Sequence, residues 1–198
     1  MKKLVLLSII LLLQSCITIN ESGYRFLSIA EKEYIKPFEQ ADFQEKKDNR
    51  ECFKLFEINT ENIKSITAKQ EYTWLHIWLP YCPNESCTNI TQYEEFEKRH
   101  SGSGLNLSFI SSTYDIDDII KYMKMSNFSK PIYVLQSSYY GVKNKKIHQK
   151  FHSEIDSNYK EEDHIFYSDY LFIEDSLVYM GNKMNDSIVK QYITKEKN

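Results

Sequence analysis

The sequence predicts an α/β protein in which helices cover a mixed β-sheet. A nearly continuous apolar stretch at 72–79, interrupted only by Thr73 and His76, has the aromatic and branched residues of a strand covered on both faces. Around it, segments with helical periodicity alternate with strand-like segments. Two short apolar runs near the C-terminus, joined by a polar turn, predict an antiparallel hairpin, which makes the sheet mixed.

The N-terminus has the features of an export signal. Lys2 and Lys3 precede a run at 4–13 that is apolar except for Ser8, and Ser15-Cys16 follows closely. The run is shorter than the roughly 20 residues that a membrane-spanning helix needs. Residues 13–16 resemble the lipobox of bacterial lipoproteins. The resemblance implies that 1–15 is a lipoprotein signal peptide and that Cys16 carries a lipid, which would anchor the protein to a membrane of the bacterial cell envelope, outside the cytoplasm. An ordinary signal peptide followed by a chance cysteine is the alternative.

Length and charge limit the number of domains and the kinds of partner that the protein can have. Removal of residues 1–15 from the 198 leaves 183, enough for one domain with an extension. We expect a tether and N-terminal arm at 16–50 and one domain at 51–198. Without Lys2 and Lys3 the 25 basic residues become 23, and against 28 acidic residues they give a net charge of −5. No basic block is present, so nucleic acid is not an expected partner.

The elements of the expected domain can be assigned in order. Residues 51–56, which contain Cys52, suit a partly buried edge strand, and 58–69 suit a helix capped by Asn59 or Thr60. The strand at 72–79 precedes an amphipathic helix whose apolar positions are Ile90, Tyr93 and Phe96.

Four segments, a hairpin and a last helix complete the domain. They are a strand at 105–110, a helix at 115–125, a strand at 131–135, a helix at 144–155, and a hairpin at 170–173 and 177–180 before a last helix at 186–195. His148 and His152 are four residues apart, and we expect them on an exposed face of the 144–155 helix.

A pair of cysteines is the candidate reactive site. Cys82 and Cys87 follow the strand at 72–79 and precede the next helix, where open α/β sheets place their reactive groups. A thiol at a helix N-terminus is stabilised as the thiolate, the form that attacks a disulfide. A second cysteine within reach can then resolve the mixed disulfide.

Residues 74–83, with their aromatic strand and Cys82-Pro83, resemble the thioredoxin superfamily, in particular its TlpA-like and ResA-like extracytoplasmic branch. The resemblance extends through the order of elements from about 58 to 195. It implies a thioredoxin-like three-layer sandwich in which Cys82 attacks and Cys87 resolves. Four residues separate the cysteines here, whereas the family has two. The family's cis-proline position falls at Ser168-Asp169, which has no proline; Pro131 takes that role only in an alternative register.

These observations predict a membrane-anchored thiol:disulfide oxidoreductase that needs no cofactor. Its partners would be the thiols or disulfides of exported proteins and a membrane-associated reductant. Two alternatives remain. The pair could form a structural disulfide in a thioredoxin-like binding module, or it could bind copper with His164, as in Sco-type proteins. We interpret His76 as a core histidine whose hydrogen bonds are satisfied.

Overall fold

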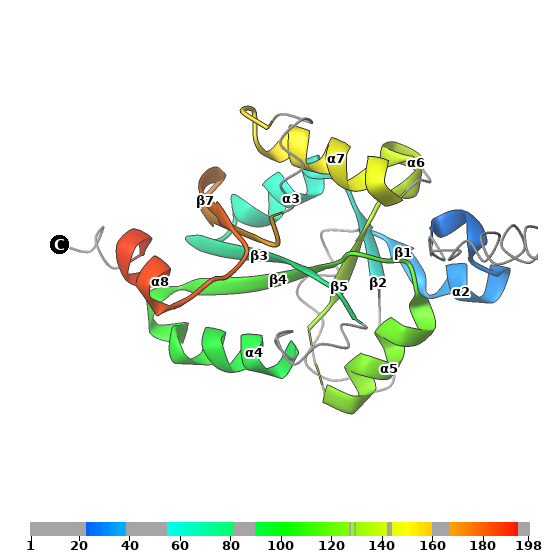
Figure 1. Ribbon diagram of the computed structural model, residues 1–198. Coiled ribbons are helices and arrows are strands. Elements are labelled where there is room, and N and C mark those ends of the chain that lie inside the picture. Colours follow the sequence, from blue (N-terminus) through cyan, green and yellow to red (C-terminus); the bar gives the residue numbers. More distant parts are fainter. Residues whose placement is uncertain are drawn as a thin grey trace, which may run out of the picture.

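The computed structural model of the chain describes residues 23–38, 55–80, 90–126, 128, 130–141, 144–159 and 167–193. Within these ranges the strands form one mixed sheet of seven, and helices lie along it (Figure 1). The elements in chain order are η1 (Tyr24–Phe26), α2 (Ile29–Glu33), β1 (Ile35–Pro37), β2 (Leu55–Ile58), α3 (Thr60–Thr67), β3 (Tyr72–Trp78), α4 (Ile90–Arg99), η3 (Ser101–Ser103), β4 (Leu105–Ser111), α5 (Ile116–Ser126), β5 (Ile132–Leu135), α6 (Ser137–Tyr140), α7 (Asn144–Ile155), β6 (Asp169–Ile173), β7 (Ser176–Gly181) and α8 (Asp186–Tyr192).

The sheet has the strand order β1-β2-β5-β4-β3-β6-β7. Strand β3 pairs in parallel with β4, from Tyr72↔Leu105 to Trp78↔Ser111, and antiparallel with β6 on its other side. Strands β1, β2 and β5 continue the parallel part, whereas β6 and β7 form the antiparallel hairpin. The carboxyl ends of β2, β3, β4 and β5 therefore meet at one edge of the sheet, which we call the carboxyl edge.

Strand β3 lies in the interior of the sheet, between β4 and β6. All seven of its residues are buried, as its nearly continuous apolar sequence predicts. Helices α3 and α7 lie on one face of the sheet, and α4 and α5 lie on the other (Figure 1). The predicted α/β architecture with a mixed sheet between two helical layers agrees with this arrangement.

The predicted helices and strands from 58 onward are all present, with boundaries that differ by a few residues. Helix α3 begins with the expected cap at Asn59. The Asn59 side chain accepts a hydrogen bond from the Asn62 backbone N–H, and the Asn62 side chain accepts one from the Asn59 backbone N–H. The strand expected at 51–56 appears as β2, at 55–58, and residues 51–54 lie outside the described part of the chain.

The N-terminal region contains elements that the sequence analysis did not predict. In residues 23–38 a 3-10 turn and a short helix lead to β1, which pairs in parallel with β2 from Ile35↔Leu55 to Pro37↔Glu57. A three-residue strand has too few positions to show a period of two, so the pattern gave no signal. Among the described helices, none has the length and apolar character that crossing a membrane requires.

Candidate functional site

The cysteine site expected from the sequence falls between two well-defined elements. Cys82 and Cys87 themselves lie outside the described residues, as do Cys16, Cys52 and His164. The chain is described to Pro80, just beyond β3, and again from Ile90, where α4 begins. The segment 81–89 therefore joins the carboxyl end of the central strand to the following helix, at the edge where α/β sheets bind ligands.

The carboxyl end of β3 is held by backbone hydrogen bonds on both sides. The Ser112 N–H donates to the Trp78 carbonyl at 2.8 Å, and the Ile77 N–H donates to the Ser168 carbonyl at 2.7 Å. These bonds connect β3 to the residue after β4 and to the residue before β6. The carboxyl end of β3 is thus fixed from two neighbouring strands.

A buried polar cluster lies on β3 and β6 near this edge. One carboxylate oxygen of Asp169 accepts a hydrogen bond from Trp74 Nε1 at 2.7 Å and lies 2.8 Å from His76 Nδ1. The other accepts from the Ser168 hydroxyl at 2.7 Å. Asp169 is 1% exposed and His76 is 6% exposed. We call Trp74, His76, Ser168 and Asp169 the Asp169 cluster.

Aromatic rings enclose the imidazole of this cluster. The ring centroid of Tyr93, on α4, lies 4.2 Å from that of His76, and Phe109, on β4, approaches edge-on at 5.9 Å. A buried carboxylate beside a buried imidazole fixes the ring orientation and stabilises a proton on Nδ1. The pair therefore holds the ring in one orientation within the core.

The sequence interpretation of His76 as a core histidine with satisfied hydrogen bonding is confirmed. Its partner was missed, because Asp169 appeared only as a position at which a proline was absent. A usable signal was present: an acidic residue opens an otherwise apolar strand, and the β3–β6 ladder pairs it directly with His76. Buried carboxylates need such partners.

The expected exposure of His148 and His152 is wrong. Both are buried, at 7% and 3% exposure, because α7 packs this side against the sheet. His148 Nε2 lies 3.2 Å from the Ser112 carbonyl oxygen, and His152 Nδ1 contacts the Tyr170 hydroxyl. Burial lowers the pKa of each imidazole to about 4, a shift that the Ser112 carbonyl partly opposes at His148 and that His148 reinforces at His152. Both rings are neutral near pH 7.

Glu57, on β2, is a second carboxyl group near the carboxyl edge, and it is half-buried. Burial raises its pKa, and the Ser137 backbone N–H, which donates a hydrogen bond to it, opposes the shift. Burial raises the pKa of the Tyr24 and Tyr114 phenols, and the nearby Glu57 carboxylate adds to each shift. Among the described residues, Glu57 Oε1 has no hydrogen-bond partner.

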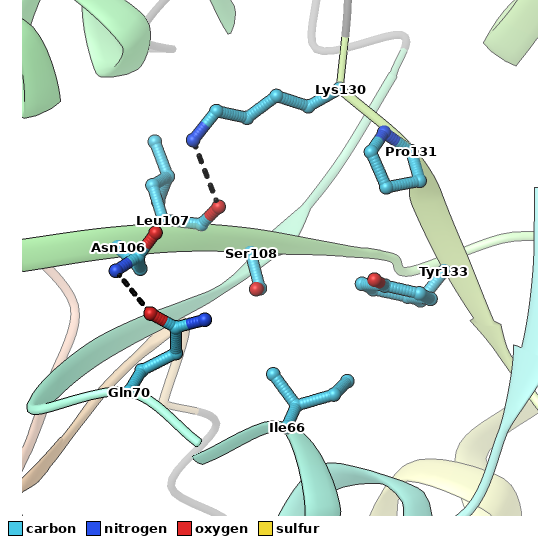
Figure 2. A pocket seen from close by; sticks show the side chains of 8 residues that line it. All are labelled: Ile66, Gln70, Asn106, Leu107, Ser108, Lys130, Pro131 and Tyr133. Carbon is cyan, nitrogen blue, oxygen red and sulfur yellow. Dashed lines mark hydrogen bonds between the residues drawn. The ribbon is translucent and has the colours of Figure 1, made fainter. Parts of the chain in front are cut away.

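A cavity of about 160 Å³ lies at the opposite end of the parallel strands. Figure 2 shows Asn106, whose side-chain N–H donates to Gln70 at 2.7 Å, and Lys130, which donates to the Leu107 carbonyl. Ile66, Ser108, Pro131 and Tyr133 complete its lining. Because it adjoins the first residues of β4 and β5, it is separate from the carboxyl edge.

Within the described ranges, no three His, Cys, Asp or Glu side chains come together as ligands for a metal ion. The copper alternative involves Cys82, Cys87 and His164, which lie outside these ranges. No protein-family model matches the chain, and no curated protein is similar enough to count as a match.

Proposed function

We propose that this protein is a lipid-anchored, extracytoplasmic thiol:disulfide oxidoreductase with a thioredoxin-like fold. The observation that carries the proposal is the position of Cys82 and Cys87, between the carboxyl end of the central strand β3 and helix α4. Cys82 is the attacking thiol and Cys87 the resolving thiol. No cofactor is required, because the sulfur atoms carry the electrons themselves.

The strand arrangement supports the thioredoxin-like part of the proposal. In chain order, β3 leads through α4 to its parallel neighbour β4, and the β6–β7 hairpin then pairs with the other side of β3 before α8 ends the fold. This order of elements agrees with the resemblance to the thioredoxin superfamily in which Ser168-Asp169 occupies the position of the family's cis-proline. In this chain that position contributes two side chains to the Asp169 cluster instead.

The reaction balances as two exchanges. The Cys82 thiolate attacks a disulfide of an exported protein, forming a mixed disulfide and releasing one substrate thiol. Cys87 then attacks Cys82, so the substrate leaves with its second thiol and the Cys82–Cys87 disulfide remains. A membrane-associated dithiol reduces that disulfide and is itself oxidised.

The redox potential of the Cys82/Cys87 pair tests the enzymatic proposal. The mature protein is equilibrated with glutathione or dithiothreitol buffers, and the fraction of free thiol is measured. We expect a potential in the range of exchanging dithiols, about −120 to −270 mV. A potential below about −300 mV would indicate a structural disulfide and refute the enzymatic role. Cys82→Ser should abolish reduction of a model protein disulfide, whereas Cys52→Ser, the matched control, should leave it unchanged.

Membrane attachment is tested separately from catalysis. Cys16→Ser should release the protein into the soluble fraction, and Cys52→Ser should leave it with the membranes. Continued membrane association of the Cys16→Ser protein would refute the lipid anchor without affecting the redox proposal.

A further inference from the structure

The N-terminal arm, residues 23–38, has one side fixed to the domain. Leu27 and Ile35 are buried in the core, and the Tyr24 ring packs edge-on against Tyr114 with centroids 5.7 Å apart. Strand β1 adds a ladder of backbone pairs to β2. Phe38 also packs against Tyr133, with ring centroids 6.2 Å apart. These contacts set the orientation of the arm and leave Phe26, Ile29 and Tyr34 exposed.

We call the exposed side chains of the arm its outer side, and several of them are large and apolar. Ile29 is 82% exposed, Phe26 is 62% exposed and Tyr34 is 49% exposed. They make up half of the six large hydrophobic side chains that are exposed in the described part of the chain, although the arm is only a small share of it. Exposed apolar side chains that gather in one short region mark an interaction surface.

Basic side chains accompany these apolar groups. The Arg25 guanidinium lies 4.4 Å from the centroid of the Phe26 ring, and Lys36 is exposed on β1. The arm contains three basic and two acidic residues in a chain whose net charge is −3. One of the acidic residues, Glu31, accepts a hydrogen bond from the Ser28 backbone N–H at 2.7 Å. Aromatic and aliphatic groups beside Arg and Lys are the composition that seats a segment at an anionic lipid surface.

The chain upstream of the arm is short. Gly23 is seven residues after Cys16, and a fully extended chain of that length spans at most about 25 Å. We propose that the outer side of the arm, with Phe26 and Ile29 as its apolar contacts, docks onto the anionic membrane surface beside the lipid. This inference rests on the lipid anchor in the proposed function.

Docking through the arm also orients the rest of the molecule. Tyr114, which Tyr24 contacts, follows β4 at the carboxyl edge, and α2 lies at that end of the sheet (Figure 1). The cysteine segment leaves β3 from the same edge. A docked arm therefore keeps this edge close to the bilayer, which suits disulfide exchange with membrane-associated partners.

Fluorescence quenching by brominated lipids tests the docking. The full-length lipoprotein is reconstituted into vesicles of phosphatidylglycerol and phosphatidylcholine with brominated acyl chains, as Ile29→Trp and as Met125→Trp. Met125, on α5, is 73% exposed and provides the matched control, and the buried Trp74 and Trp78 give both proteins the same background. We expect bromine to reduce the added emission of the Ile29→Trp protein and to leave that of the Met125→Trp protein unchanged.

The possible outcomes separate the two proposals. A protein that does not float with the vesicles overturns the anchor and, with it, the docking. A protein that floats but shows equal quenching at positions 29 and 125 overturns the docking alone. A further variant, Phe26→Ser with Ile29→Ser, should leave flotation intact and make Cys82 more accessible to a soluble thiol reagent, because the carboxyl edge is then free to move away from the bilayer. Unchanged accessibility contradicts the proposed orientation.

Discussion

The Nδ1 atom of His76 lies 2.8 Å from the carboxylate of Asp169, although 93 residues separate them in the sequence. The two residues are directly paired across the β3–β6 ladder, and Trp74 Nε1 donates to the same carboxylate oxygen. All three side chains are buried away from water, so each depends on another member of the cluster for a hydrogen-bond partner. The cluster joins β3 to the C-terminal hairpin near the carboxyl end of β3.

Removal of the Asp169 carboxylate should destabilise the fold strongly. Asp169→Ala leaves the Trp74 N–H and the His76 imidazole buried without their acceptor, so we expect a loss of about 3 kcal/mol or more in the free energy of unfolding. Asp175→Ala, in the exposed turn of the same hairpin, is the control and should change stability by less than about 0.5 kcal/mol. Urea denaturation measures both. Equal losses from the two variants would contradict the role of the cluster.

Stability should fall in acid because of the two histidines on α7. Their folded pKa of about 4 lies below the unfolded value of about 6.5, so the unfolded chain binds more protons between these two pH values. The free energy of unfolding should therefore be insensitive to these groups above about pH 6.5 and decrease as the pH falls toward 4, by up to about 3 kcal/mol for each imidazole.

Thermal unfolding at several pH values measures this dependence. His148→Gln removes one of the two titrating groups, so its stability should change less between pH 6.5 and 4 than that of the wild type. His100→Gln is the control, because His100 is partly exposed and pairs with the exposed Asp186. A wild-type stability that does not change across this pH range would rule out the explanation.

Gly104 should tolerate substitution less well than its neighbour Gly102. Gly104 has a φ of +80°, and an added Cβ would lie 3.1 Å from Glu71 Oε2, whereas a Cβ at Gly102 meets no atom within 4 Å. We expect Gly104→Ala to cost about 1 kcal/mol or more, and Gly102→Ala to be nearly neutral. The midpoints of denaturant unfolding compare the two, and indistinguishable midpoints would be inconsistent with strain at Gly104.

The cap of α3 should contribute measurably to stability. The Asn59 side chain accepts from the Asn62 backbone N–H at 3.0 Å and donates to Gln136 at 3.1 Å. Asn59→Ala should lower the free energy of unfolding by about 1 kcal/mol. Asn158→Ala, in an exposed turn after α7, is the control and should have little effect. Equal effects would mean that the cap adds nothing specific.

The sequence by itself determined the order of the main elements from α3 to α8, apart from the four-residue helix α6, and the interior position of β3. Both follow from local patterns: a helix repeats its apolar positions along one side, and a strand covered on both faces is apolar throughout. The position of Cys82 and Cys87 after β3 followed from the same reasoning. So did the burial of His76, because it stands within an apolar strand.

Only the tertiary structure decided which distant residues meet. Asp169 becomes the acceptor for His76 through strand pairing, and no local pattern specifies the partner of a strand. His148 and His152 are buried because α7 lies with that side against the sheet, although its sequence is mostly polar. Likewise, β1 forms because the edge of β2 offers backbone partners to a short segment without a period of its own. Periodicity records which side of an element is apolar, whereas its partners depend on how all the elements pack together.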